Sequence, residues 1–132
     1  MSMEGVEMEK QEDSISNLSD SILNSVKKLL GLLPEIKDFD SDILMNINAA
    51  IFTLQQIGVG NQKELFLIED ESKTYEDFLG EKSNLIPLVR MYLYYKTKMS
   101  FDPPQSGVVE NSIKELIQET EWRLIVETEN RR

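Results

Sequence analysis

The chain has 132 residues, of which 40% are apolar and 29% charged, and this is the size and composition of one ordinary globular domain. It contains no cysteine and no histidine, which excludes disulfides, thiolate chemistry, cysteine-ligated zinc and the commonest general base. The net charge of −10 argues against nucleic-acid binding, because contacts to phosphate depend mainly on Lys and Arg.

The chain begins with an acidic segment. Residues 1–20 carry six acids and one lysine, so about half of the net charge lies there. We interpret residues 1–14 as an acidic N-terminal tail in front of a single helical domain, 15–132. The alternative is an arm that becomes ordered on a neighbouring protein.

Apolar residues at helical spacing predict a first helix that begins as early as Ser14 rather than at Asp20. Gly31 and Pro34 are expected to end it. The residues that share its apolar face are Ile15, Leu18, Ile22, Val26, Leu29 and Leu33.

Residues 38–42 alternate aspartate with other residues, as the start of a calcium loop does. The pattern then fails, because Ile43 stands where that loop needs glycine and Ala49 where it needs glutamate. Helix capping explains the segment instead. We expect Asp40 to cap the helix and Asp42 to complement its dipole.

This second helix is predicted to run to Ile57, with Phe39 stapled onto Leu44. Gly58 suits the left-handed position after the helix, with Val59 folding back onto its last turn. The expected core stripe is Ile43, Leu44, Ile47, Ala50, Ile51 and Leu54. A second stripe, roughly opposite, consists of Met45, Ala49, Phe52 and Gln56.

Residues 61–82 look irregular and carry seven acids and three lysines. The apolar run 65–68 is either a strand fragment or a plug into the core. Residues 69–71 are expected to form a solvated turn rather than a cation site. Residues 74–77 open a short helix with a capping-box pattern. Its expected anchors are Phe78 and Leu79.

The strongest pattern predicts a helical hairpin over residues 84–124, joined at Asp102, Pro103 and Pro104, because two prolines interrupt helical geometry. Its first helix is expected to start at Asn84 with Pro87 in the first turn. The predicted apolar side is Leu85, Leu88, Val89, Tyr92, Leu93, Tyr95 and Met99. The predicted polar strip is Arg90, Tyr94, Thr97 and Lys98.

Lys96 falls within that apolar side, so its ammonium must either reach solvent or meet a carboxylate. The second helix of the hairpin is expected to be capped by Ser106, with Glu110 in its first turn. Its core stripe is predicted as Val109, Ile113, Leu116, Ile117, Thr120 and Leu124. The opposite flank carries Val108, Trp122 and Val126, for which a monomer offers no core.

Two short motifs carry a family resemblance: Phe101-Asp102-Pro103-Pro104 and, further along, Glu121-Trp122-Arg123-Leu124. In this order, and with the upstream segments 47–51 and 54–60, they resemble the head-tail connector (adaptor) proteins of long-tailed bacteriophages. These are small helical proteins that form a ring beneath the portal. The resemblance covers roughly residues 18–124.

The resemblance implies a homo-oligomeric ring, a dodecamer, that binds the portal protein and extends the DNA channel towards a stopper or next connector protein. DNA would pass through without sequence-specific binding. The protein would be made in the cytoplasm of the bacterial host and reside in the virion, at the head-tail junction. Lys27, Lys28 and the acids of residues 61–82 are all candidates to line the channel.

The residues themselves predict an all-α fold, a small bundle of about four helices with a central long-helix hairpin and one irregular acidic loop segment. No phosphate loop, nucleophile elbow or acid/base pair is visible, so we expect neither an enzyme nor a cofactor or metal. No apolar run approaches the ~20 residues that cross a bilayer, and no signal peptide is recognisable, so no membrane partner is expected.

The leading hypothesis is therefore a structural assembly protein whose helices carry a second apolar face for neighbouring subunits. The alternative is an acidic helical regulator, or DNA mimic, that binds a host or phage protein. The candidate subunit or portal interface residues are Met45, Phe52, Arg90, Tyr94, Lys98, Trp122 and Val126.

Overall fold

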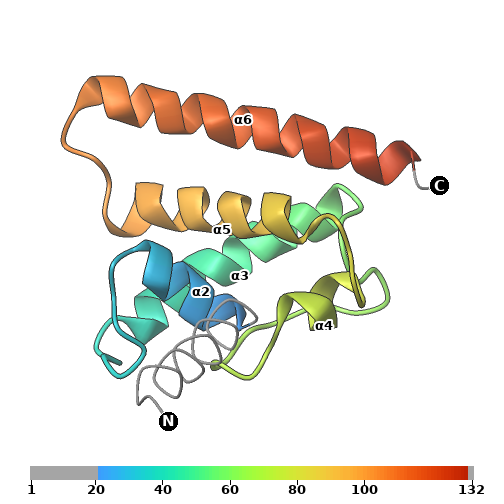
Figure 1. Cartoon of the computed structure of the whole chain (residues 1–132), viewed down its shortest axis with the longest axis horizontal. Coiled ribbons are helices and arrows are strands. Elements are labelled where there is room, and N and C mark those ends of the chain that lie inside the picture. The colour runs from blue at the N-terminus through green and yellow to red at the C-terminus, as the bar shows by residue number, and fades with distance from the viewer. Residues whose placement is uncertain (1–20, 131–132) are drawn as a thin grey trace, which may run out of the picture.

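Helix α5 (Ile86–Phe101) lies at the centre of the molecule, between the long helix α6 (Gly107–Asn130) and a layer of three shorter helices (Figure 1). The structure is a computed structural model that describes residues 21–130. The third layer contains α2 (Ile22–Leu29), α3 (Asp40–Gln56) and α4 (Tyr75–Leu79). Within residues 21–130 the only extended pairing is one isolated antiparallel bridge between Ser21 and Thr74. The predicted all-α bundle is confirmed.

The predicted hairpin is confirmed as α5 and α6, but α5 begins slightly later than expected. Asn84 is not the cap. The helix starts at Ile86, and the Ser83 hydroxyl accepts the backbone N–H of Leu85 at 3.2 Å. Pro87 does lie in the first turn.

The predicted polar strip of α5 was wrong at Thr97, which is fully buried together with Val89, Tyr92 and Leu93. The reason is that α5 is covered on opposite sides, by α3 and by α6. Lys96 is half-buried, and no carboxylate of the described residues forms an ion pair with it. This fits an ammonium that reaches solvent along its aliphatic stem.

Helix α2 confirms part of the first predicted helix. Ile22 and Val26 are completely buried, and Gly31 ends the helix with φ 84°. The prediction was wrong for Leu29 and Leu33, which are exposed, because the helix stops at Leu29 and the chain turns away from the core. The proposed start at Ser14 and the tail 1–14 lie outside the described residues.

Helix α3 has the predicted core stripe: Ile43, Ile47, Ala50, Ile51 and Leu54 are buried and Leu44 packs against them. Gly58 is left-handed (φ 94°), and the Val59 N–H returns to the Leu54 carbonyl at 2.9 Å, as predicted. The predicted cap was wrong. Asp40 is the first helical residue, Phe39 precedes it without a side-chain cap, and the Asp40 carboxylate binds Lys27 instead.

The run 65–68 is a plug and not a strand, since Phe66 and Ile68 are buried while Leu65 and Leu67 are exposed. The capping box of α4 is present: Thr74 accepts the Asp77 N–H, and Asp77 accepts the Thr74 N–H.

Ser106 caps α6 as predicted, by accepting the Val109 N–H at 3.4 Å. The core stripe of α6 was only partly right. Thr120 and Leu124 are buried and Ile113 and Ile117 half-buried. Val109 and Leu116 are exposed, because α6 packs mainly against the shorter α5 and a single neighbour covers a narrow strip.

Candidate subunit interface

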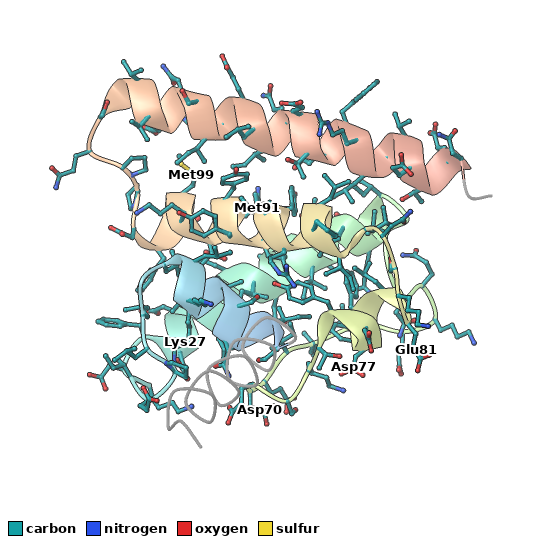
Figure 2. The ribbon with its side chains drawn as sticks, in the orientation of Figure 1. Lys27, Asp70, Asp77, Glu81, Met91 and Met99 are labelled. Carbon is teal, nitrogen blue, oxygen red and sulfur yellow. The ribbon has the colours of Figure 1, made fainter. Side chains whose placement is uncertain are left out.

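The hairpin that displays the candidate surface is fixed by polar bonds as well as by packing. Tyr92 of α5 donates its hydroxyl to Glu121 Oε1 of α6 at 2.7 Å. At the turn, Lys98 Nζ pairs with the Asp102 carboxylate at 2.8 Å. Met99 lies between the two helices (Figure 2). These contacts set the position of α6 and of the side chains on its outer side.

One face of α6 carries an exposed tryptophan. Trp122 is 64% exposed, because it lies about 160° around the helix from the buried Leu124 at 100° per residue. Beside it, a groove of about 410 Å³ separates the start of α5 from the C-terminal half of α6. We call it the α6 groove, and its lining residues are Asn84, Leu85, Leu88, Trp122, Arg123, Val126 and Glu127.

A second apolar surface lies on α3, on the side away from its core stripe. Met45 is 68% exposed and Phe52 51% exposed. Leu65 and Leu67 of the neighbouring extended segment are exposed as well. We call these four residues the α3 surface. Sequence reasoning identified Met45 and Phe52 but assigned Leu65 and Leu67 no surface role.

Two amides on α3 hold the extended segment in place. Asn48 Nδ2 donates to the Ile68 carbonyl at 2.9 Å, and Asn48 Oδ1 accepts the Ile68 N–H at 2.8 Å. Gln55 accepts the Phe66 N–H at 3.3 Å and donates to the Glu64 carbonyl at 2.9 Å. These side chains satisfy backbone groups that would otherwise need a partner strand. Sequence reasoning missed them.

The remaining candidate residues have partners inside the subunit. The Arg90 guanidinium lies over the Tyr75 ring, 5.1 Å from its centroid. Tyr94 is half-buried, and its ring lies 5.5 Å from that of Tyr95. Lys98 is occupied by Asp102. An interface role for these three residues remains a prediction.

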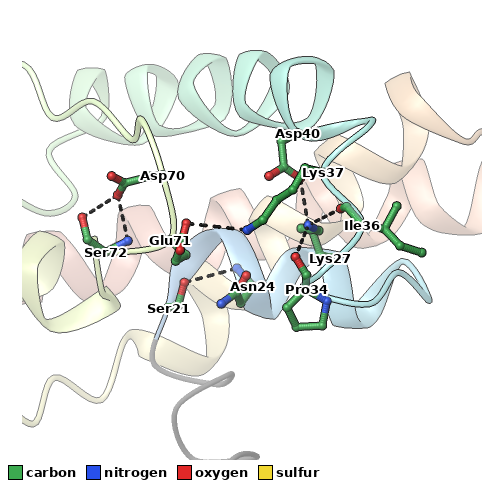
Figure 3. Close-up of polar contacts among 10 residues, drawn as sticks. All are labelled: Ser21, Asn24, Lys27, Pro34, Ile36, Lys37, Asp40, Asp70, Glu71 and Ser72. Atoms are coloured by element: carbon green, nitrogen blue, oxygen red, sulfur yellow. Dashed lines mark hydrogen bonds and ion pairs between the residues drawn. The ribbon is translucent and has the colours of Figure 1, made fainter.

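Lys27 was a candidate to line the channel, but it is completely buried. Its Nζ donates to the Pro34 carbonyl at 3.1 Å and the Ile36 carbonyl at 2.6 Å (Figure 3). It also pairs with Asp40 Oδ1 at 2.8 Å. The buried ammonium therefore has two carbonyl acceptors and one carboxylate as partners, and these contacts fasten the α2–α3 loop between its two helices.

The shifted pKa values reflect internal bonds. Burial raises the pKa of Tyr92, and the hydrogen bond to Glu121 with its negative charge raises it further. Burial also raises the pKa of Tyr75, against the opposing hydrogen bond with Ser25. Hydrogen bonds from Ser72 lower the pKa of Asp70. Tyr92 and Tyr75 join elements that are distant in the sequence, whereas the Asp70 contact is local to one exposed turn.

The acidic side chains of the irregular region are spread out. Asp70, Asp77 and Glu81 all lie on the side of the molecule away from α6 (Figure 2). Among residues 21–130, no three carboxylates come together in a way that could hold a metal ion. None of the described helices is long and apolar enough to cross a membrane.

Comparison with protein families matches residues 22–131 to a family described as phage connector protein. The chain belongs to this family. Searches among curated proteins and among solved structures give no match. As a phage connector, the protein has a structural role at the head-tail junction of the virion.

The two connector motifs divide into internal and surface residues. Phe101 packs edge-on against Phe39 with centroids 5.5 Å apart, and Leu124 is fully buried. Asp102 and Glu121 bind Lys98 and Tyr92, as described above. Pro103 and Pro104 lie in the turn between α5 and α6. Asp102, Pro103, Trp122 and Arg123 are exposed, and Arg123 pairs with Glu119 on the same helix at 2.7 Å.

Proposed function

We propose that this connector forms a homo-oligomeric ring, a dodecamer, on the portal and extends the DNA channel towards the tail. A stopper or next connector protein would bind its other end. The observation that carries the proposal is that one subunit has two exposed apolar surfaces, the α3 surface and the α6 groove with Trp122, on helices that pack on opposite sides of α5.

The direction of these surfaces favours a ring over a dimer. The α3 surface points away from the α3 core stripe, and Trp122 points away from Leu124, so each surface faces outwards on its own side of α5. Two different patches on one subunit support heterologous contacts, which repeat around an axis and close into a ring. Large aromatic residues and Met are also the side chains enriched at such contacts.

The charge of the chain fits a channel through which DNA slides. A net charge of −10 repels the phosphate backbone instead of retaining it. Lys27 is excluded from the lumen by its burial, which leaves Lys28 and the acids of residues 61–82 as candidates.

The experiment is negative-stain imaging of the full chain, alone and mixed with the portal protein encoded in the same phage genome. We expect rings in the mixture with the portal. Rings in the preparation without the portal would also support the proposal, but they are not required. A protein that stays monomeric or dimeric in both preparations, and does not decorate the portal, would contradict the proposal and favour an acidic regulator.

A further inference from the structure

The outer side of α3 lacks the charges that cover the rest of the molecule. Residues 43–62 contain no Asp, Glu, Lys or Arg, although 29% of the chain is charged. The exposed positions in this stretch include Met45, Ala49, Phe52 and Gln56. Depletion of charge around exposed Met and aromatic residues is typical of the core of a protein–protein interface.

The extended segment widens this surface and makes it rigid. Successive side chains of an extended segment point to opposite sides. Phe66 and Ile68 are buried, so Leu65 and Leu67 project outwards. Phe52 and Leu65 border one shallow hollow of about 370 Å³. Because Asn48 and Gln55 hold the segment, the surface is already formed before a partner arrives.

The α6 groove is the other exposed apolar surface of the subunit. It is a concavity with Leu88, Trp122 and Val126 in its walls, and Met45 and Phe52 project from the α3 surface. Helix α6 itself is acidic, with six acids and two bases in Gly107–Asn130. Contact between two α6 faces would therefore bring like charges together, whereas the uncharged α3 surface brings none.

The rims of the two surfaces carry charges of both signs: Lys63 and Glu64 beside the α3 surface, and Arg123 and Glu127 on the α6 groove. Arg123 already pairs with Glu119. Lys63 lies beside Phe52 and Leu65, and among the described residues no ion pair involves it. Glu127 lies on the α6 groove, and no ion pair within residues 21–130 involves it either. A contact that brings Lys63 to Glu127 places a cation beside an anion, and neither forms an ion pair within residues 21–130.

We propose that the α3 surface of one copy docks into the α6 groove of the next, with Phe52 beside Trp122 and Val126 and with Lys63 facing Glu127. This inference rests on the proposed ring and names the two surfaces that form it. The partner is a second copy of this chain. An α3 surface paired with itself would close a two-fold dimer and leave the α6 groove uncovered.

Charge reversal tests the rim. In sedimentation velocity of the full chain, with the portal protein present if rings need it, Lys63→Glu and Glu127→Lys should each weaken association about three- to ten-fold. The association of the variant with both substitutions should recover to within about two-fold of that of the parent. Glu129→Lys, also exposed on α6, is the matched control and should change association less than two-fold. Single variants without effect, or a double variant that is no better than the singles, would overturn the pairing.

Cross-linking tests the contact itself, since the chain contains no cysteine. The variant with both Phe52→Cys and Val126→Cys should give a ladder of oligomers beyond the dimer on mild oxidation, and each single variant should give none. Circular dichroism of each variant verifies the fold. A covalent dimer from Phe52→Cys alone would establish a two-fold contact and overturn the inference.

Imaging the same samples separates this inference from the proposed function. Rings without a ladder would overturn the α3–α6 pairing while leaving the ring intact. The absence of any assembly larger than a dimer would contradict the ring, and the pairing with it.

Discussion

The hydroxyl of Tyr92 donates a 2.7 Å hydrogen bond to the carboxylate of Glu121, and this bond joins the central helix to the outermost one. Glu121 belongs to one of the two motifs that carry the family resemblance, and through this bond it helps to fix the position of α6 against α5. Leu124 adds apolar packing one turn further along the same side of the helix. Together they determine where Trp122 points.

Alkaline pH should destabilise the fold through Tyr92. Its pKa is raised in the folded state above the ordinary value of about 10, so the protonated phenol favours folding. That contribution is complete below about pH 10 and is lost as the pH rises further. Tyr92→Phe should lower the free energy of unfolding by about 1 kcal/mol at pH 8. Between pH 8 and 11, urea unfolding should then show a smaller further loss of that free energy for Tyr92→Phe than for the parent. Tyr94→Phe is the control, and equal pH profiles for Tyr92→Phe and the parent would refute the assignment.

Lys27 should be essential for stability, because it is a buried lysine with three partners and not a surface charge. Lys27→Met leaves the Asp40 carboxylate and two loop carbonyls without their partner, and should cost about 3 kcal/mol in the free energy of unfolding. The exposed neighbour provides the control: Lys28→Met should stay within about 0.5 kcal/mol of the parent. Chemical denaturation measures both, and similar values for the two variants would show that the buried clamp is not needed.

Asn48 should stabilise the extended segment beneath the α3 surface. Asn48→Ala removes both hydrogen bonds to Ile68 and should cost about 1–3 kcal/mol, with faster amide exchange at Ile68. Asn46→Ala loses only one bond, to the Asp42 carbonyl, and should change stability by less than about 0.5 kcal/mol. Unchanged exchange at Ile68 would mean that the segment is held by its buried side chains alone.

Trp122 should matter for assembly and not for folding. Trp122→Ala should retain the helix content and thermal stability of the parent, while ring or portal association weakens by about 2 kcal/mol or more. Leu124→Ala, two residues away and buried, should instead destabilise the fold by about 2–4 kcal/mol. A large drop in the melting temperature of Trp122→Ala would place that ring in the core.

Removal of residues 1–14 should leave the thermal unfolding temperature nearly unchanged, since we predict that this acidic segment is a tail. The truncated chain should unfold within about two degrees of the parent. A drop of several degrees would show that the segment packs on the domain.

The parts of the fold that follow local rules were predictable from the sequence. Pro103 and Pro104 place the hairpin turn, Gly58 places the end of α3, and apolar periodicity identifies the buried side of that helix. Local chemistry also identified the capping box at Thr74. The exposed Phe52 and Trp122 followed from the same periodicity, because they lie opposite the core stripes.

The missed features all depend on contacts between distant residues. Lys27 resembles any surface lysine until the loop after α2 brings two carbonyls and Asp40 to its ammonium. Asn48 resembles a surface amide until the extended segment lies beside it. The burial of Thr97 and the exposure of Leu116 were predicted wrongly. Apolar periodicity shows which side of a helix is the most apolar, but not how many neighbouring helices cover it.

The emission spectrum of the single tryptophan tests the central claim most directly, namely that copies of this chain cover the exposed apolar faces of one another. Emission should be measured as the full chain assembles, alone at rising concentration and on the portal, with the oligomer mass followed in parallel. The account predicts a solvent-exposed, red-shifted spectrum for the monomer and a blue shift that follows the gain in mass. A spectrum that stays red-shifted in the complete assembly, or is already blue-shifted in the monomer, would contradict it.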